Sequence, residues 1–260
     1  MTFGLKAWNG STIVTIDDNT RALVYMGKVP IPDQSVHVSV DIGCKGVPTV
    51  YFGIPVGRSD RAGVAVTGIK SAGTDLWRVS LTVYNPAGAA LGLYLRWFGL
   101  LNLNYPTGSG VNWGMRLWDA YSRIIFDSGL KMHRLAGNTY GTELVLRPSV
   151  PDKSEAANAY DTSAVLPFTL AGKSIRANAR GTVHFPEYVG TYTDFDHTVV
   201  DQYNKKTYET VYAASGSTLN VMRVVTDEIM FETAIPLLID MSKYQTVYSR
   251  LAVIDNAVFP

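Results

Sequence analysis

The chain has 260 residues, with 23 basic and 22 acidic side chains and a formal net charge of +1. Charged residues make up 17% of the sequence, below the roughly 25% usual in soluble globular proteins, and hydrophobic residues make up 47%. This composition excludes a disordered chain, and the near-neutral balance argues against a partner that is nucleic acid or an anionic membrane surface. The low charge indicates extensive burial, in a large core or against other chains.

The first six residues, Met1-Thr2-Phe3-Gly4-Leu5-Lys6, contain no basic region followed by an apolar run, so we expect no secretory signal and folding in the cytoplasm. Cys44 is the single cysteine, which excludes an internal disulfide and a thiolate metal cluster; we expect it to be a small buried hydrophobe. The most apolar segment, residues 91–101, is interrupted by Arg96 and is shorter than the roughly 20 residues needed to cross a bilayer. We therefore expect no membrane insertion.

Apolar and polar residues alternate with a period of two in several segments, which predicts half-buried β-strands. The predicted strands cover residues 36–41, 77–84, 91–97, 221–226 and 246–258. Turn signals separate them at Asn9-Gly10, residues 86–88, residues 106–110 and Gly216. A helical pattern is confined to residues 154–160, and Pro236 argues against a helix over residues 229–241. The sequence therefore predicts an all-β fold of sandwich or barrel type.

An internal repeat relates two segments that lie 110 positions apart. Gly4-Leu5-Lys6-Ala7-Trp8-Asn9 matches Gly114-Met115-Arg116-Leu117-Trp118-Asp119, and the match continues without gaps to Asp17 and Asp127. Each copy predicts a β-hairpin, in which one strand ends in Trp and the returning strand is closed by Asp. We expect Trp8 and Trp118 to occupy the same place in two cores.

The repeat also predicts a division of the chain. Residues 102–112 are polar, rich in Gly and contain Pro106, as is typical of a linker. We therefore predict an N-terminal β-sandwich over residues 1–108 and a C-terminal β-sandwich over residues 109–260, each opening with a related hairpin and each immunoglobulin-like or jelly-roll-like. The alternative is one sandwich that contains both hairpins.

The two hairpins resemble the start of small tail proteins of long-tailed bacteriophages. The resemblance rests on Phe3-Gly4-Leu5-Lys6-Ala7-Trp8-Asn9 with Ile16-Asp17-Asp18-Asn19-Thr20-Arg21, and on Trp113-Gly114-Met115-Arg116-Leu117-Trp118-Asp119 with Ile124-Ile125-Phe126-Asp127-Ser128. In that family a hairpin of this pattern recurs in tail-tip, baseplate or fibre-associated (minor tail) components. The family pattern carries no catalytic residues and leaves most of the chain unmatched.

The resemblance implies a non-enzymatic structural protein of the virion tail, made in the host bacterial cytoplasm and acting through protein–protein assembly. Because a tail is symmetric about its axis, we expect a homotrimer or homohexamer that also contacts other tail proteins. The alternative is a carbohydrate- or receptor-binding module that mediates host attachment. We expect no cofactor and no bound metal.

Two groups of residues are candidate contact sites. A candidate interface lies at the end of the apolar segment 91–101 and comprises Trp97, Phe98, Leu100 and Leu101. The alternative is that these side chains close the core. Candidate glycan or partner contacts crowd into one later region: Tyr188, Tyr192, Asp194, Asp196, Tyr203 and Tyr208, with Tyr212 beyond them. Aromatic rings beside carboxylates suit sugar binding, although tyrosines that alternate on strands are also ordinary sheet formers.

The sequence offers little catalytic chemistry. It has neither a phosphate-binding loop nor a Gly-x-Ser-x-Gly nucleophile turn. His37, the other three histidines and the basic residues are scattered, without the spacing of a helical zinc site or of a nucleic-acid stripe. Asp194 and Asp196 lie two residues apart, which leaves a hydrolase or a cation site as a third hypothesis beside that of a solvated loop.

Overall fold

The computed structural model describes residues 4–8, 13–17, 22–34, 36–58, 62–135, 143–146, 162–177, 183–193, 199–233 and 247–259. The fold is all-β, as predicted, and every pairing between named strands is antiparallel. The strands are β1 (Gly4–Trp8), β2 (Ile13–Asp17), β3 (Leu23–Pro30), β4 (Val36–Gly43), β5 (Thr49–Gly53), β6 (Gly63–Gly73), β7 (Leu76–Tyr84), β8 (Tyr94–Leu100), β9 (Arg116–Trp118), β10 (Ile124–Asp127), β11 (Glu143–Leu146), β12 (Thr162–Val165), β13 (Lys173–Ala177), β14 (Val183–Thr193), β15 (Val199–Ser215), β16 (Thr218–Thr233) and β17 (Val247–Asp255). A single turn of helix, α1 (Leu101–Asn104), follows β8.

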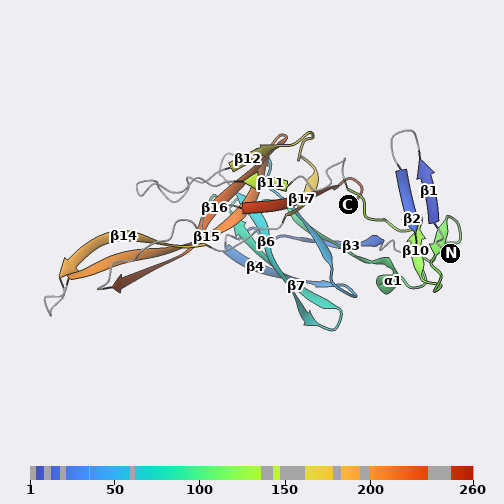
Figure 1. Ribbon diagram of the computed structural model, residues 1–260, viewed down its shortest axis with the longest axis horizontal. Helices are drawn as coiled ribbons and strands as arrows, with labels where there is room; N and C mark the ends of the chain where they lie inside the picture. The colour runs from blue at the N-terminus through green and yellow to red at the C-terminus, as the bar shows by residue number, and fades with distance from the viewer. Residues whose placement is uncertain are drawn as a thin grey trace.

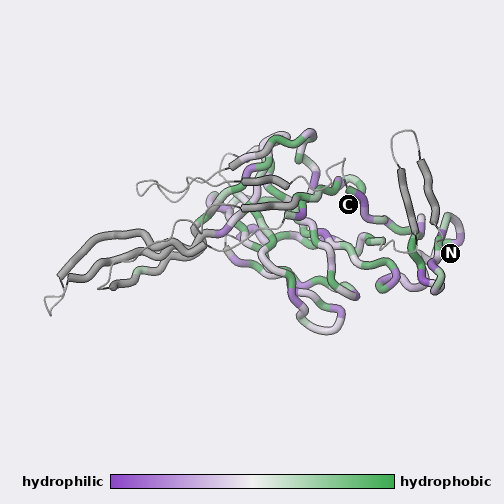
Figure 2. The backbone as a smooth tube through the Cα atoms, viewed as in Figure 1, coloured by the Kyte–Doolittle hydropathy of each residue, from purple (hydrophilic) through white to green (hydrophobic). Residues whose placement is uncertain are grey.

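Two large sheets form the body of the molecule (Figure 1). One is six-stranded in the order β11-β17-β13-β5-β8-β3, and the other is seven-stranded in the order β12-β16-β15-β6-β7-β4, with β14 attached to β15. Their inner faces share one hydrophobic core, in which the rings of Phe52 on β5 and Tyr212 on β15 lie 6.1 Å apart. Figure 2 shows hydrophobic residues running through these central strands. This arrangement is consistent with a β-sandwich.

Both sheets combine strands from the two sides of residue 108. In the first sheet Ile175 on β13 pairs with Phe52 on β5, and in the second Tyr212 on β15 pairs with Val64 on β6. This pairing crosses the predicted boundary at residue 108, so each large sheet contains strands from both predicted units, while the two hairpins lie outside the large sheets. Residues 102–112, predicted as a linker, comprise the rest of α1 and a loop that leads from the six-stranded sheet toward the β9–β10 hairpin.

The two predicted hairpins form small two-stranded sheets of their own, β1–β2 and β9–β10. The strands end and return at the predicted residues, but the registers differ: Trp8 pairs with Ile13, whereas Trp118 pairs with Ile124, one position further along the repeat. Trp118 is 53% exposed. The expectation that Trp118 fills a core is therefore wrong; the buried hydrophobic side chain of the second hairpin's return strand is that of Ile124.

Strands β14, β15 and β16 extend beyond the sandwich as an antiparallel arm, on the left of Figure 1. β15 and β16 pair continuously from Ser215↔Thr218 beside their connecting turn to Asp201↔Thr233 in the arm. Near the turn the strands contribute buried side chains such as Leu219 to the core. A β-bulge interrupts the β15–β16 register between Thr207 and Tyr208, where the core part of the pair gives way to the arm.

The predicted strands largely coincide with β4, β7, part of β16 and β17. The strand expected from residue 91 begins instead at Tyr94, because Gly92 has a positive φ of 62° that breaks the extended backbone. The sequence did not predict α1, whose C-terminal Asn104 donates to the carbonyl oxygens of Lys45 and Leu100. The predicted helix over residues 154–160 lies outside the described residues. In the described ranges no helix has the length and hydrophobicity to span a membrane.

Gly63 on β6 tests the packing of the shared core. A Cβ at this position would lie 2.5 Å from Cγ2 of Val211 and 2.7 Å from Cε of Met222, both buried. We expect Gly63→Ala to lower the free energy of unfolding by about 1–3 kcal/mol through overpacking, measured by urea denaturation. The matched control is Gly68→Ala on the same strand, where the nearest atom to an added Cβ is 3.9 Å away. Equal losses at both positions would contradict the packing of β15 over β6.

Candidate functional site

Exposed aromatic and aliphatic side chains gather in one stretch of the chain, residues 111–121, which we call the aromatic segment. It comprises the loop before β9, β9 itself and the turn toward β10. Trp113 is 84% exposed, Tyr121 is 80% exposed and Trp118 is about half exposed. Val111 and Met115 add two exposed aliphatic side chains. Large apolar side chains concentrated at the surface mark a site of interaction with another molecule.

A buried carboxylate, Asp127 at the end of β10, holds the base of the aromatic segment in place. It accepts hydrogen bonds from the backbone N–H groups of Ser109 and Gly129, both at 2.8 Å, and from Nε of Arg116 at 2.9 Å. Burial acts to raise the pKa of Asp127, but these donors outweigh it and lower the pKa to about 2. The carboxylate is therefore ionised at neutral pH and joins the loop before β9 to the hairpin.

A second carboxylate, Asp119, fixes the turn between β9 and β10. It accepts hydrogen bonds from the backbone N–H groups of Tyr121 and Arg123, each at 2.9 Å, and from Nε of Arg123 at 2.6 Å. This arrangement resembles an Asx turn reinforced by an ion pair. Tyr121 thus projects from a turn whose backbone is fixed by hydrogen bonds.

Two arginines connect these carboxylates to the exposed rings. The guanidinium carbon of Arg116 lies 5.9 Å from the ring centroid of Trp118, and that of Arg123 lies 5.2 Å from the ring of Tyr121. Each arginine therefore stacks on an aromatic ring while its charge is balanced by a buried carboxylate. The resulting surface is aromatic and locally near-neutral. Trp, Tyr and Arg are the residues that contribute most to binding at protein interfaces.

The predicted glycan contacts lie on the projecting arm where they are described. Tyr188 on β14 and Tyr203 on β15 are direct register partners. Tyr192 pairs with Val200, and Tyr208 pairs with Val183, so the register separates these two tyrosines from the first pair. Asp194 and Asp196 lie outside the described residues. Tyr212 is buried in the core.

The predicted interface residues divide between the core and its margin. Phe98 and Leu101 are buried, so they have no surface to offer a partner, and this part of the prediction is corrected. Trp97 is half-buried, packs against the main core and donates from Nε1 to the carbonyl oxygen of Gly43 at 3.0 Å. Leu100 is half-buried as well. These positions match the alternative in which the segment closes the core.

Cys44 and His133 are buried or largely buried, whereas the side chain of His37 is about half exposed. Cys44 is buried as expected, and burial raises the pKa of its thiol. His133 is largely buried, which lowers its pKa to about 4, and its Nε2 lies 2.7 Å from the hydroxyl of Tyr51. His37 lies 3.6 Å from Glu209, a buried carboxylate that accepts a hydrogen bond from Thr82. Across the described ranges, no three His, Cys, Asp or Glu side chains are grouped so as to hold a metal ion.

The sequence showed the residues of the aromatic segment but not their exposure. Trp118 belongs to the repeat, which predicts a place in a core for it, and Trp113 is the aromatic residue that precedes Gly114 in the second copy. Adjacent strand residues face opposite sides, so Leu117 and Trp118 point to different faces of β9, but this alternation carries no signal of which face is exposed. Comparison of the chain with protein-family models, with curated proteins and with solved structures finds no match.

Proposed function

We propose that this chain is a non-enzymatic structural component of a bacteriophage virion, in the tail tip, the baseplate or a fibre-associated position. It acts by binding copies of itself and other tail proteins. The observation that carries the proposal is the aromatic segment, in which Trp113, Trp118 and Tyr121 are exposed on or beside a hairpin held by ion pairs to two buried carboxylates. The same hairpin contains the motif by which the sequence resembles phage tail proteins.

The proposal has a structural part. We propose that the two hairpins share an origin and that the shared sandwich is of immunoglobulin-like or jelly-roll type. Supporting this, the hairpin strands end at corresponding residues of the repeat: β1 at Trp8 and β2 at Asp17, β9 at Trp118 and β10 at Asp127. A hairpin that stands outside both large sheets is free to contact a neighbouring chain without disturbing the core.

The test is the mass of the purified protein by light scattering at several concentrations. We expect a trimer or hexamer for the unchanged chain, and dissociation of the double variant Trp113→Ala, Trp118→Ala. Each interface aromatic of this kind contributes about 2 kcal/mol or more, so each truncation should weaken assembly about 30-fold. Val47→Ala, which alters an exposed side chain outside the segment, is the matched control and should leave assembly unchanged.

The outcome separates this proposal from glycan binding. A chain that stays monomeric at every concentration, or a double variant that assembles like the unchanged chain, would contradict assembly through the aromatic segment. One observation favours the alternative of a carbohydrate- or receptor-binding module: Tyr188 and Tyr203 are register partners on the arm. Opposed residues of an antiparallel pair lie close enough to form one contact surface.

A further inference from the structure

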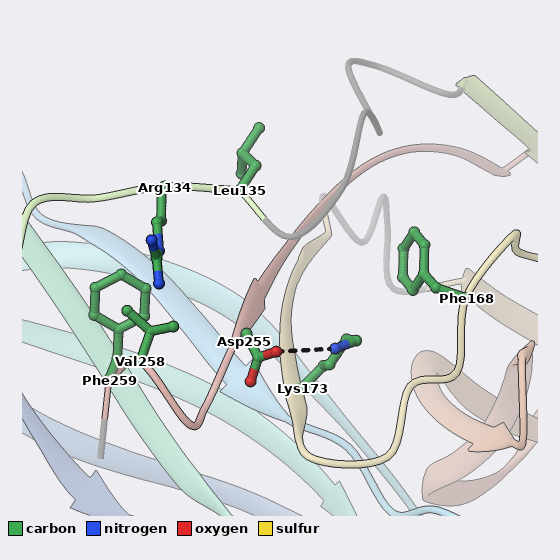
Figure 3. Close-up of a pocket in the computed structure, with 7 residues that line it drawn as sticks. All are labelled: Arg134, Leu135, Phe168, Lys173, Asp255, Val258 and Phe259. Atoms are coloured by element: carbon green, nitrogen blue, oxygen red, sulfur yellow. Dashed lines mark hydrogen bonds and ion pairs between the residues drawn. The ribbon is translucent and has the colours of Figure 1, made fainter. Parts of the chain in front are cut away.

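A pocket of about 390 Å³ lies where β13 begins and β17 ends in the six-stranded sheet (Figure 3). Three parts of the chain form it: the segment after β10, the start of β13 with the loop before it, and the end of β17 with the residues that follow. The lining residues are Arg134, Leu135, Phe168, Lys173, Asp255, Val258 and Phe259. A pocket of this size accommodates a small organic molecule.

More cationic than anionic side chains line the pocket. Lys173 pairs with Asp255, with Nζ 3.3 Å from Oδ2, and the other carboxylate oxygen accepts a hydrogen bond from the backbone N–H of Ala257 at 2.9 Å. Arg134 also interacts electrostatically with Asp255, so two cations share this carboxylate, and in Figure 3 the guanidinium of Arg134 points toward Val258 and Phe259. The pocket therefore has one cation more than it has anions, and a guanidinium directed at a cavity favours an anionic ligand.

The apolar side of the pocket is held firmly. Phe259 is buried, and its ring packs edge-on against Phe98 with centroids 4.9 Å apart. Its backbone carbonyl accepts a hydrogen bond of 2.7 Å from Nε of Arg96, a buried arginine that also donates to Ser174. Phe168, half-buried, stands at the other side of the pocket in Figure 3. A ligand in this pocket therefore meets the half-buried side chains of Phe168 and Val258 as well as charge, and the buried ring of Phe259 supports this apolar side from behind.

We propose that this pocket binds a small organic carboxylate, whose charged group pairs with Arg134 and Lys173 and whose apolar part contacts Val258 and Phe168. A carboxylate fits the planar, two-pronged donor geometry of a guanidinium. Lys173 remains beside Asp255 and turns one of its three ammonium donors to the ligand. The site is separate from the aromatic segment and does not depend on assembly.

Benzoate is the probe, because it joins a carboxylate to a flat apolar ring. We expect saturable binding of about millimolar affinity, followed by calorimetry or by NMR shifts of the residues that line the pocket. Benzamide, which keeps the ring without the charge, should bind at least about tenfold more weakly, and so should inorganic phosphate, which lacks the ring.

The variant that tests the contact is Arg134→Gln, which should weaken benzoate binding about tenfold or more and leave the melting temperature unchanged, since the side chain is exposed. Lys70→Gln removes an exposed cation from β6 and serves as the control. Absence of saturable benzoate binding, or equal binding by the Arg134 variant, would overturn the proposal. If benzamide bound as tightly as benzoate, the proposed role of the charge would be overturned. If phosphate bound as tightly as benzoate, the proposed role of the apolar side of the pocket would be overturned.

Discussion

Replacing Phe98 with alanine is expected to lower the free energy of unfolding by about 3–5 kcal/mol, measured by urea denaturation. Phe98 lies in β8 and is completely buried. Its ring contacts those of Tyr51 and Tyr25, at centroid distances of 5.6 and 5.7 Å, and it packs edge-on against Phe259. Truncation removes these contacts and leaves a cavity where the sheet, the segment after β10 and the end of the chain meet.

The control for Phe98→Ala is a substitution of an aromatic residue that is exposed instead of buried. Trp113→Ala removes a larger ring that is almost fully exposed, so its effect on the free energy of unfolding should stay within about 0.5 kcal/mol. The same two variants should reverse their order in the assembly measurement. If Phe98→Ala cost no more than Trp113→Ala, the assignment of Phe98 to the core would fail and the interface predicted from the sequence would return.

Asp127→Ala is expected to have the second largest effect, a loss of about 2–4 kcal/mol in the free energy of unfolding. The carboxylate is 2% exposed and accepts hydrogen bonds from Ser109, Gly129 and Arg116. Its removal leaves buried N–H donors without an acceptor and a guanidinium without its counter-charge, each of which costs about 1–3 kcal/mol before relaxation. Because the same carboxylate holds the base of the aromatic segment, the variant should also assemble less well.

The pH dependence follows from the lowered pKa of Asp127. The folded pKa of about 2 lies below the unfolded value of about 3.9, so the stabilisation is fully present above pH 4 and is lost as the pH falls toward 2. The difference in stability between the unchanged chain and Asp127→Asn should narrow over that interval. The control is Asp41→Asn, which breaks an equally short but exposed pair with Arg78 and should cost far less. A constant difference from pH 7 to pH 2 would refute the assignment.

The all-β fold could be predicted from the sequence because the alternation of apolar and polar residues in a strand depends only on neighbouring residues. The alternation in residues 36–41 and 77–84 is typical of strands with one covered face, and these residues lie in β4 and β7, which pair with each other. The mixing of strands from both halves was not predicted, because the partners Phe52 and Ile175 are far apart in the chain and nothing in either strand specifies the other. Long-range pairing depends on how whole faces pack, which periodicity does not reveal.

The candidate site was predicted only in part, for a similar reason. Alternation places Leu117 and Trp118 on opposite sides of β9 but does not say which side is covered. Aromatic residues favour both cores and interfaces, so the content of Trp and Tyr indicated burial without saying against what. Arg134 gave no signal at all, because the pocket it faces is assembled from three distant parts of the chain.

The bulge between Thr207 and Tyr208 has a consequence for how related chains can diversify. A bulge bends a strand and increases its twist, so the direction in which the arm leaves the body is set at this one point in the β15–β16 ladder. The residues of β15 and β16 nearer the turn pack in the core, and this packing does not depend on the direction of the arm. Insertion or loss of one residue at the bulge would therefore redirect the arm while leaving the body intact. A change of one residue at the bulge could therefore turn the arm toward a different binding partner during evolution.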